Sequence, residues 1–321
     1  MRRTLLFIVL ALCCGQGVFA AEEEGIWVAA GYGGRRMISE DGQTWSITGE
    51  WSQPGGDDSH NLMSAVYAEG KFVVVGGGGG GRFGTPGGHV LVSRDGREWK
   101  ETWSPQSRVN PIVFGDGRFV VGGPQRKLYW SDDAENWQEG AVLEDRVATH
   151  FRHGAYGNGV FVFVGNHGGN GGPSWCAVSP DGQTVTNLRT DMPGHGRLVY
   201  GNGQFLMMTS HSDAELVGSV DGIEWNPVQI ADGARLRWIV WTSEEFVAGD
   251  GKTAWFSSNG HDWTAEELQV RGRVVWSDGH QFITTGWPGK MGWTERGGKW
   301  HASPELTANG INEVIFGKPT P

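Results

Sequence analysis

Basic side chains gather just ahead of the apolar segments that recur along this chain. The set comprises Arg108, Arg152, His153, Arg197, Arg235, Arg237, Arg271 and Arg273. Guanidinium groups that converge on one point bind a carboxylate, sulfate or phosphate through paired hydrogen bonds. We therefore take five of these residues as candidate ligand-binding residues. They are Arg152, His153, Arg197, Arg237 and Arg273.

A structural role is the alternative for these arginines. Each could cap nearby backbone carbonyls or pair with an acid such as Asp145, Asp191 or Glu313. Neighbouring residues of an extended strand also point to opposite sides. We therefore expect that Arg152 and Arg237 do not both converge with Arg197 and Arg273.

Three insertions between the recurring segments add polar side chains to the candidate ligand-binding set. Segment 51–61 carries Asp57, Asp58 and His60, the glycine-rich segment 76–88 carries Arg82, and segment 166–173 carries His167. The glycine-rich segment lacks the Lys-Ser/Thr ending of a phosphate-binding loop, which favours a flexible surface loop. No histidines here have metal-ligand spacing, and we expect neither a metal nor a cofactor.

No residues outside the repeats form a recognisable catalytic set. Three tyrosines share a repeated strand-end position that phenylalanine and tryptophan also fill, which indicates aromatic packing rather than a tyrosine nucleophile. They are Tyr67, Tyr156 and Tyr200. A glycosidase with paired carboxylates stays an alternative, with an acid of segment 51–61 facing Glu144 or Asp145.

The elements that must position these residues form a repeat with a pitch of about 40 residues. A turn that reads Ser-Glu-Asp-Gly-Gln-Thr-Trp in its first copy recurs at 39–45, 93–99, 131–137, 179–185, 219–225, 257–263 and 294–300. Each repeat also holds a strand that ends in an aromatic residue and a strand that opens with phenylalanine. Asn-Gly and Asp-Gly between such strands predict hairpins. Seven repeats of four antiparallel strands predict an all-β, seven-bladed β-propeller.

The two ends of the repeat region complement each other. The first repeat begins at Ile26 without its first strand, and the chain finishes with an extra first strand at 311–317. If the C-terminal strand joins the N-terminal blade, the ring closes without an open sheet edge. We therefore expect a single propeller domain over residues 21–321.

The turn resembles the Asp-box, or BNR repeat, of sialidases, sortilin-type receptors, xyloglucan hydrolases and photosystem II assembly-factor propellers. The resemblance covers residues 26–317, although Asp and Gly are adjacent here and later copies replace them, with Ala134 for Gly and Asn259 for Asp. Such drift predicts a structural role, in which the carboxylate caps its turn and the tryptophan packs between blades. We assign this role to Asp41, Trp45, Asp95, Trp99, Trp137, Asp221, Trp225, Trp263 and Trp300.

Residues 1–20 predict an export signal, with Arg2 and Arg3 ahead of an apolar stretch and a small-residue cleavage site at Ala20. Loss of the two arginines changes the net charge from −10 to −12, which disfavours nucleic acid and anionic lipid as partners. Cys176 is then the one remaining cysteine, so no internal disulfide forms. We expect a secreted or periplasmic monomer without membrane insertion.

These features together predict an exported, non-catalytic propeller that binds a protein or glycan through its loop-bearing face and central channel mouth. The alternative is a carbohydrate-active enzyme, a glycoside hydrolase or lyase with a sialidase-like fold, acting on an acidic saccharide. A third hypothesis follows from the assembly-factor resemblance, which implies an arginine patch that docks a partner protein.

Overall fold

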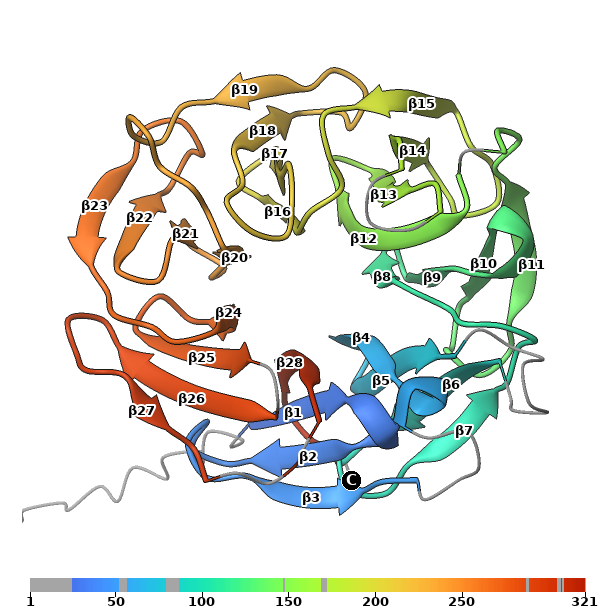
Figure 1. The fold of residues 1–321 in the computed structure, drawn as a ribbon. Coiled ribbons are helices and arrows are strands. Elements are labelled where there is room, and N and C mark those ends of the chain that lie inside the picture. The colour runs from blue at the N-terminus through green and yellow to red at the C-terminus, as the bar shows by residue number, and fades with distance from the viewer. Residues whose placement is uncertain are drawn as a thin grey trace, which may run out of the picture.

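The computed structural model describes residues 25–51, 57–78, 87–146, 148–168, 172–286, 289–304, 307 and 309–320. Seven four-stranded sheets stand around a common axis like the blades of a propeller (Figure 1). The predicted all-β, seven-bladed propeller with four antiparallel strands per blade is therefore confirmed. The predicted signal at residues 1–20 and the candidate Arg82 lie outside the described residues. Among the described residues, no helix is both long enough and apolar enough to cross a bilayer.

Each blade runs from an inner strand at the axis to an outer strand at the rim, and we number the blades in chain order. Blade 1 holds β28 (Ile311–Gly317), β1 (Ile26–Gly31), β2 (Arg36–Ser39) and β3 (Ser46–Gly49). Blades 2 to 4 hold β4 (Leu62–Ala68), β5 (Lys71–Gly77), β6 (Gly88–Ser93) and β7 (Lys100–Trp103); β8 (Ile112–Gly115), β9 (Arg118–Gly122), β10 (Lys127–Ser131) and β11 (Gln138–Val142); and β12 (His150–Gly157), β13 (Val160–Asn166), β14 (Ser174–Ser179) and β15 (Asn187–Met192). Blades 5 to 7 hold β16 (Leu198–Gly201), β17 (Gln204–Met208), β18 (Leu216–Ser219) and β19 (Asn226–Val228); β20 (Trp238–Trp241), β21 (Phe246–Gly249), β22 (Thr253–Ser257) and β23 (Thr264–Glu267); and β24 (Arg273–Ser277), β25 (Gln281–Gly286), β26 (Lys290–Glu295) and β27 (His301–Ala302). Short 3-10 helices lie at η1 (Tyr32–Gly34), η2 (Asp57–His60) and η4 (Pro124–Arg126).

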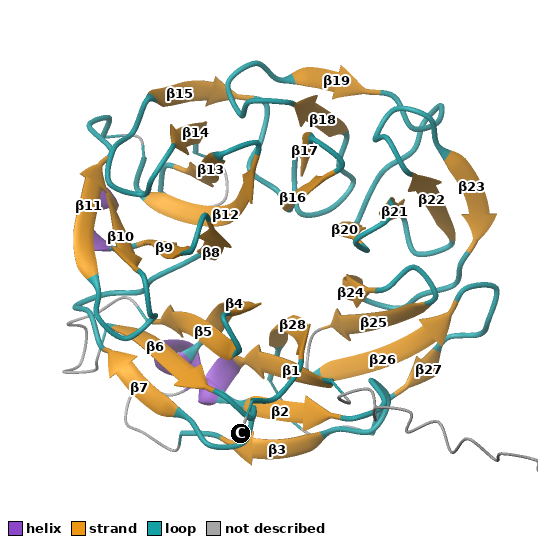
Figure 2. Ribbon diagram, turned by 180° about the vertical axis from the view of Figure 1, so that it is seen from behind, coloured by secondary structure: helices purple, strands orange, loops and turns teal. Residues whose placement is uncertain are grey.

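The ring closes in blade 1, where both ends of the chain meet. Strand β28 pairs antiparallel with β1, with Trp27 opposite Phe316 and Ala29 opposite Val314. The two strands lie side by side in both views (Figures 1 and 2). The predicted closure by the C-terminal strand is therefore confirmed. Because hydrogen bonds join the first and last strands, opening the ring requires breaking that ladder.

Neighbouring blades contact each other through the aromatic residue that ends each inner strand. The Tyr200 ring packs on Gly157 of the preceding blade so closely that a β-carbon on this glycine would lie 2.1 Å from it. Tyr200 also packs on Phe205 in the next strand of its own blade, with ring centroids 4.8 Å apart. The same contact recurs between Tyr156 and Gly115. Where a glycine follows the strand-end aromatic residue, it thus makes room for the aromatic ring of the next blade, because it lacks a β-carbon. It is not needed there for a special backbone conformation.

The repeated turns are held by their own acidic residue. The Asp41 carboxylate accepts hydrogen bonds from the backbone N–H groups of Gln43 and Thr44, at 2.8 and 2.7 Å. Partial burial acts to raise the pKa of Asp41, but these hydrogen bonds outweigh it and lower the pKa. Four further turns have the same geometry and a lowered pKa. The turn aspartates of this group are Asp41, Asp95, Asp133, Asp181 and Asp221.

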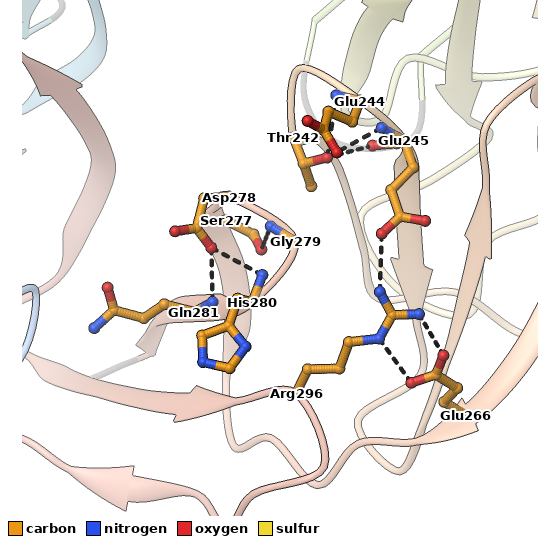
Figure 3. Close-up of polar contacts among 10 residues, drawn as sticks. All are labelled: Thr242, Glu244, Glu245, Glu266, Ser277, Asp278, Gly279, His280, Gln281 and Arg296. Atoms are coloured by element: carbon orange, nitrogen blue, oxygen red, sulfur yellow. Dashed lines mark hydrogen bonds and ion pairs between the residues drawn. The ribbon is translucent and has the colours of Figure 1, made fainter.

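The seventh turn is held differently, because Arg296 stands where the other turns have an aspartate or, in the sixth, Asn259. Its guanidinium reaches blade 6 and pairs with Glu245, at 3.0 Å, and with both carboxylate oxygens of Glu266 (Figure 3). The guanidinium also lies 3.7 Å from the centre of the Phe256 ring. An ion pair between blades therefore replaces the local cap in this turn.

Candidate functional site

A cavity of about 430 Å³ lies at the centre of the ring, and residues of all seven blades line it. Polar side chains occupy the end at which the inner strands begin, and we name this set the channel mouth. It consists of Ser64, Asn110, Arg152, His153, Arg197, His211, Arg273, Asn312 and Glu313. Apolar side chains such as Val199, Val240 and Ile315 line the cavity beyond it. The predicted site residues that line this cavity are Arg152, His153, Arg197 and Arg273.

The repeat register explains how these residues meet. In several blades, the residue three positions before the aromatic residue that ends the inner strand faces the axis. This residue is polar in blades 1, 2, 4, 5 and 7. These residues are Glu313, Ser64, His153, Arg197 and Arg273. An alignment of the inner strands on their aromatic residue therefore carries a signal for Ser64 and Glu313, which the candidate set above lacks. His211 comes from the connection between β17 and β18, and no repeat signal marks it.

Arg152 lines the same cavity as Arg197 and Arg273 whereas Arg237 does not, which agrees with our expectation that the two would not both converge there. Arg152 reaches the cavity because of a β-bulge in β12. Phe151 pairs with Gly165 and His153 pairs with Val164, which leaves Arg152 as an extra residue in the ladder. The bulge breaks the strict alternation of sides, so both Arg152 and His153 line the cavity.

Side-chain amides hold the bulged segment in place. The Asn110 amide of the preceding blade donates a hydrogen bond to the Arg152 carbonyl oxygen at 3.0 Å. The Arg152 guanidinium in turn donates to the Asn166 side-chain oxygen at 2.7 Å. In blade 1, Asn312 makes the equivalent contact and donates to the Leu62 carbonyl oxygen at 2.7 Å. Hydrogen bonds between blades therefore hold the backbone at Arg152 and the Asn312 segment to which Arg273 bonds.

An ion pair spans the channel mouth between Arg197 and Glu313. The two guanidinium nitrogens donate to the two carboxylate oxygens at 2.7 and 3.0 Å, a bidentate arrangement. Arg197 belongs to blade 5 and Glu313 to blade 1, which lie on opposite sides of the ring (Figure 1). The side chains are 23% and 12% exposed. The pairing that we considered as the alternative for Arg197 is thus present, and this arginine is not open to a ligand in this state.

The other two arginines of the channel mouth have neutral partners. Arg273 donates to the Asn312 backbone carbonyl oxygen at 2.9 Å. No carboxylate among the described residues forms an ion pair with Arg152 or Arg273. Burial and the nearby Arg197 lower the pKa of Arg273. With three arginines, one glutamate and neutral histidines, the channel mouth carries a formal charge of +2 in a strongly acidic protein.

A cluster of three imidazoles borders these arginines. The His153 and His211 ring centres are 5.8 Å apart, and those of His195 and His211 are 5.6 Å apart. The His195 ring is fixed by a 2.7 Å contact between its Nδ1 atom and the Ser174 hydroxyl. Burial, followed by the charge of Arg197, lowers the pKa of His153 well below its ordinary value. These histidines are therefore neutral near pH 7 and act as hydrogen-bonding groups.

Three predicted site residues lie exposed and do not line the cavity. They are Asp58, His167 and Arg237. Asp57 forms an ion pair with Arg35 at 3.1 Å and accepts a hydrogen bond from the Asn309 amide at 2.9 Å. These contacts tie η2 to the neighbouring backbone, which assigns Asp57 a structural role.

His60 lies within the fold rather than in a ligand-facing loop, so that part of our expectation is wrong. It is 2% exposed, and its Nδ1 atom lies 3.1 Å from Nε2 of His89. His89 in turn contacts Glu101 at 2.6 Å, and the Trp51 ring packs on His89 with ring centres 4.5 Å apart. His60, the last residue of η2, therefore joins His89 of β6 and Glu101 of β7 in one polar cluster.

The described part of the chain contains no group of three or more histidine, cysteine, aspartate or glutamate side chains placed to hold a metal ion. A glycosidase would need two carboxylates in one cleft. Among the described residues that line the cavity, Glu313 is the one acid, and Arg197 binds both of its oxygens. The geometry of this cavity therefore suits binding of an anionic group.

Comparisons with known proteins concern the fold. No protein-family model matches the chain, and no curated protein matches it. The chain is similar to the solved structure of YCF48 from Cyanidioschyzon merolae, with a TM-score of 0.53, 13% identity, and coverage of 79% of this chain and 94% of that chain. It is also similar to YCF48 bound to D1 peptide, with a TM-score of 0.55, 14% identity, and coverage of 81% and 93%. At these identities the likeness shows a shared propeller fold.

Proposed function

We propose that this protein is a non-catalytic binding propeller whose channel mouth takes a carboxylate of a protein partner. The observation that carries the proposal is the pair Arg152 and Arg273, two partly buried guanidiniums that face one cavity without an ion-pair partner among the described residues. Partly buried cations without an ion-pair partner are costly in a stable protein, so the presence of two at one opening favours an anionic ligand.

The internal pair between Arg197 and Glu313 supports a carboxylate as the ligand group. It shows that a carboxylate fits a guanidinium fork in this cavity with two short hydrogen bonds. A structure of the same fold, YCF48 bound to D1 peptide, holds a peptide, which is consistent with a protein partner here. Because that likeness concerns the fold alone, the proposal depends on the arginines.

Two further parts of this proposal come from the sequence. We propose that the protein acts outside the cytoplasm after residues 1–20 are removed, and that an acidic saccharide is the second class of ligand. A saccharide carboxylate would meet the same two arginines, and in that case the protein would act as a lectin rather than as a hydrolase. Purification from a native source and N-terminal sequencing would test the export step.

A capture experiment tests the protein partner. Mature wild-type protein, the double variant Arg152→Ala/Arg273→Ala and the control Arg237→Ala would be crosslinked in extracts of the source cells and compared by quantitative mass spectrometry. Arg237 is exposed and does not line the cavity, so its loss should change nothing. We expect the double variant to capture at least about tenfold less of the specific partner than wild-type protein does, because truncating one side of a charge pair at an interface costs several kcal/mol of binding free energy.

A second step identifies the ligand group. A synthetic peptide of the captured partner would be titrated in two forms, with its carboxylates intact and with them amidated. We expect wild-type protein to bind the amidated peptide at least about tenfold more weakly than the intact peptide. The double variant should bind both peptides with the same low affinity. Equal capture by the wild-type protein and the double variant, with both variants folded, would overturn the proposal.

A further inference from the structure

The channel mouth places titratable imidazoles directly beside the arginines that would hold an anion. His153 lies on β12 next to Arg152, and His211 reaches it from the connection between β17 and β18, with their ring centres 5.8 Å apart. Both line the same cavity as Arg152 and Arg273. An anion bound in this cavity would therefore contact or closely approach two neutral imidazoles as well as two guanidiniums.

We propose that the channel mouth is a proton-coupled oxyanion site, in which His153 or His211 takes up a proton when a sulfate or carboxylate group binds at Arg152 and Arg273. This inference rests on the proposed function for the place of the ligand, and it adds the regulation of that place by pH. The chemistry is that of hydrogen bonding and charge compensation, because a neutral imidazole that gains a proton donates from both nitrogens and adds one positive charge opposite the anion.

The charges that face the two imidazoles come from several blades. They are Arg152 in blade 4, His195 and Arg197 at the start of blade 5, Arg273 in blade 7 and Glu313 in blade 1. The arginines disfavour a proton on the imidazoles in the empty site, and the one acid is engaged by Arg197. A bound dianion would offset two of these positive charges and so favour the proton.

The electrostatics of the empty site agree with this geometry. Burial and then Arg197 lower the pKa of His153 well below its ordinary value. His211 keeps one side in solvent, yet desolvation, His195 and Arg152 lower its pKa to about 4. Both imidazoles are therefore neutral at pH 6 to 7 until a ligand changes their surroundings.

The sign of the pH dependence follows from linkage. A ligand that raises an imidazole pKa binds more tightly as the pH falls through the pKa of the bound state, and the gain ends below the pKa of the empty state. If the anion restores one imidazole to its ordinary pKa of about 6.5, the affinity rises about tenfold between about pH 7.5 and about pH 5.5. Near pH 6 the same shift corresponds to uptake of about 0.7 proton per bound anion.

The test is calorimetric titration of the mature full-length protein with sodium sulfate. Sulfate stays a dianion over this pH range, so a change of affinity or any proton uptake belongs to the protein. Titration near pH 6 in two buffers of different ionisation enthalpy measures the number of protons taken up. We expect about 0.7 proton per sulfate, about tenfold tighter binding at the lower pH, and a flat pH profile in the variant His153→Gln/His211→Gln.

Controls separate this proton coupling from a general effect of pH. The single variant His211→Gln should fold, since this residue lies in a connection between strands with one side in solvent, and it should reduce the proton uptake. His301→Gln removes an exposed imidazole that stacks on Trp293 at the rim, and it should behave as wild type. Arg152→Ala/Arg273→Ala should abolish sulfate binding at every pH.

The outcomes distinguish this inference from the proposed function. Sulfate binding that depends on Arg152 and Arg273 but has no proton uptake and a flat pH profile overturns the inference and leaves the anion site standing. Absence of sulfate binding overturns the inference even if a protein partner is captured. Proton-coupled sulfate binding without any partner that depends on these arginines supports the inference and overturns the proposed protein partner.

Discussion

The ion pair across the channel mouth gives the sharpest prediction, because one substitution should change two properties in opposite directions. Glu313→Gln keeps the shape of the side chain and removes its negative charge. Arg197 then loses a bidentate partner that joins blade 1 to blade 5. At the same time, the channel mouth gains one unit of net positive charge, from +2 to +3. We therefore expect lower stability and tighter binding of anions.

The loss of stability follows from the burial of the pair. Breaking a buried ion pair costs about 3–5 kcal/mol, and an exposed pair contributes less than about 1 kcal/mol. With the two side chains 23% and 12% exposed, we expect a loss of about 2 kcal/mol in the free energy of unfolding. For a chain of about 300 residues, that loss lowers the Tm by about 3 °C.

The gain in anion affinity follows from distance. Arg273 bonds to the backbone of Asn312, the residue next to Glu313, so an anion held by Arg273 lies within about 8 Å of the Glu313 carboxylate. At an effective dielectric constant of about 20–40, the removed repulsion amounts to about 1–2 kcal/mol for each negative charge of the anion. Sulfate carries two negative charges, so it should bind at least about thirty-fold more tightly to Glu313→Gln than to wild-type protein.

Urea denaturation and sulfate titration at neutral pH measure both effects. Glu40→Gln is the matched control, because Glu40 makes an exposed ion pair with Arg97, and the change should cost less than about 0.5 kcal/mol and leave sulfate binding unchanged. Unchanged stability of Glu313→Gln would show that the pair contributes nothing in solution. Weaker sulfate binding would refute the electrostatic account of the channel mouth.

Further predictions test the scaffold. Gly157→Ala places a methyl group 2.1 Å from the Tyr200 ring and should lower the free energy of unfolding by about 1–3 kcal/mol in urea denaturation. Arg296→Ala removes the ion pairs to blade 6 and should cost about 1–2 kcal/mol by the same assay, against less than about 0.5 kcal/mol for Arg97→Ala. Burial raises the pKa of the Cys176 thiol to about 12, so a disulfide reagent should react with it only as the protein unfolds. The turn aspartates have lowered pKa values in the folded state, so their contribution to the stability of the fold is present above about pH 4 and should be lost as the pH falls further. Thermal unfolding between about pH 6 and about pH 2 would measure this loss.

Each of these predictions has an opposing result. A loss below about 0.5 kcal/mol for Gly157→Ala would mean that the Tyr200 ring moves aside freely. Equal losses in the free energy of unfolding for Arg296→Ala and Arg97→Ala would show that the ion pairs between blades do not stabilise the seventh turn. Rapid labelling of Cys176 in folded protein would indicate local opening of blade 4, and constant stability down to pH 2 would show that the turn aspartates do not stabilise the fold.

The sequence predicted the fold because the signals for it are local and repeated. Turn chemistry, the strand-end aromatic with its glycine, and the run of apolar residues in each strand all act within about ten residues, and seven copies reinforce them. The missing first strand at Ile26 and the surplus strand at 311–317 were enough to predict how the ring closes. No long-range information was needed, because each blade contacts mainly its neighbours.

The candidate site was less accessible from sequence, since it depends on how inner strands from different blades meet. The bulge at Arg152 reverses the side that simple alternation predicts, and it depends on packing against Asn110 of the blade before. The pair of Arg197 with Glu313 joins residues 116 positions apart, on opposite sides of the ring.

Sequence by itself therefore determined the propeller, its strand order and its closure, because those follow from turn residues and periodicity that each blade carries within itself. Only the tertiary structure decided which arginines share the cavity, that Glu313 neutralises one of them, and that His60 is buried against His89. The physical reason is that charge and burial depend on distances between blades, and those distances are set when the seven blades close into a ring.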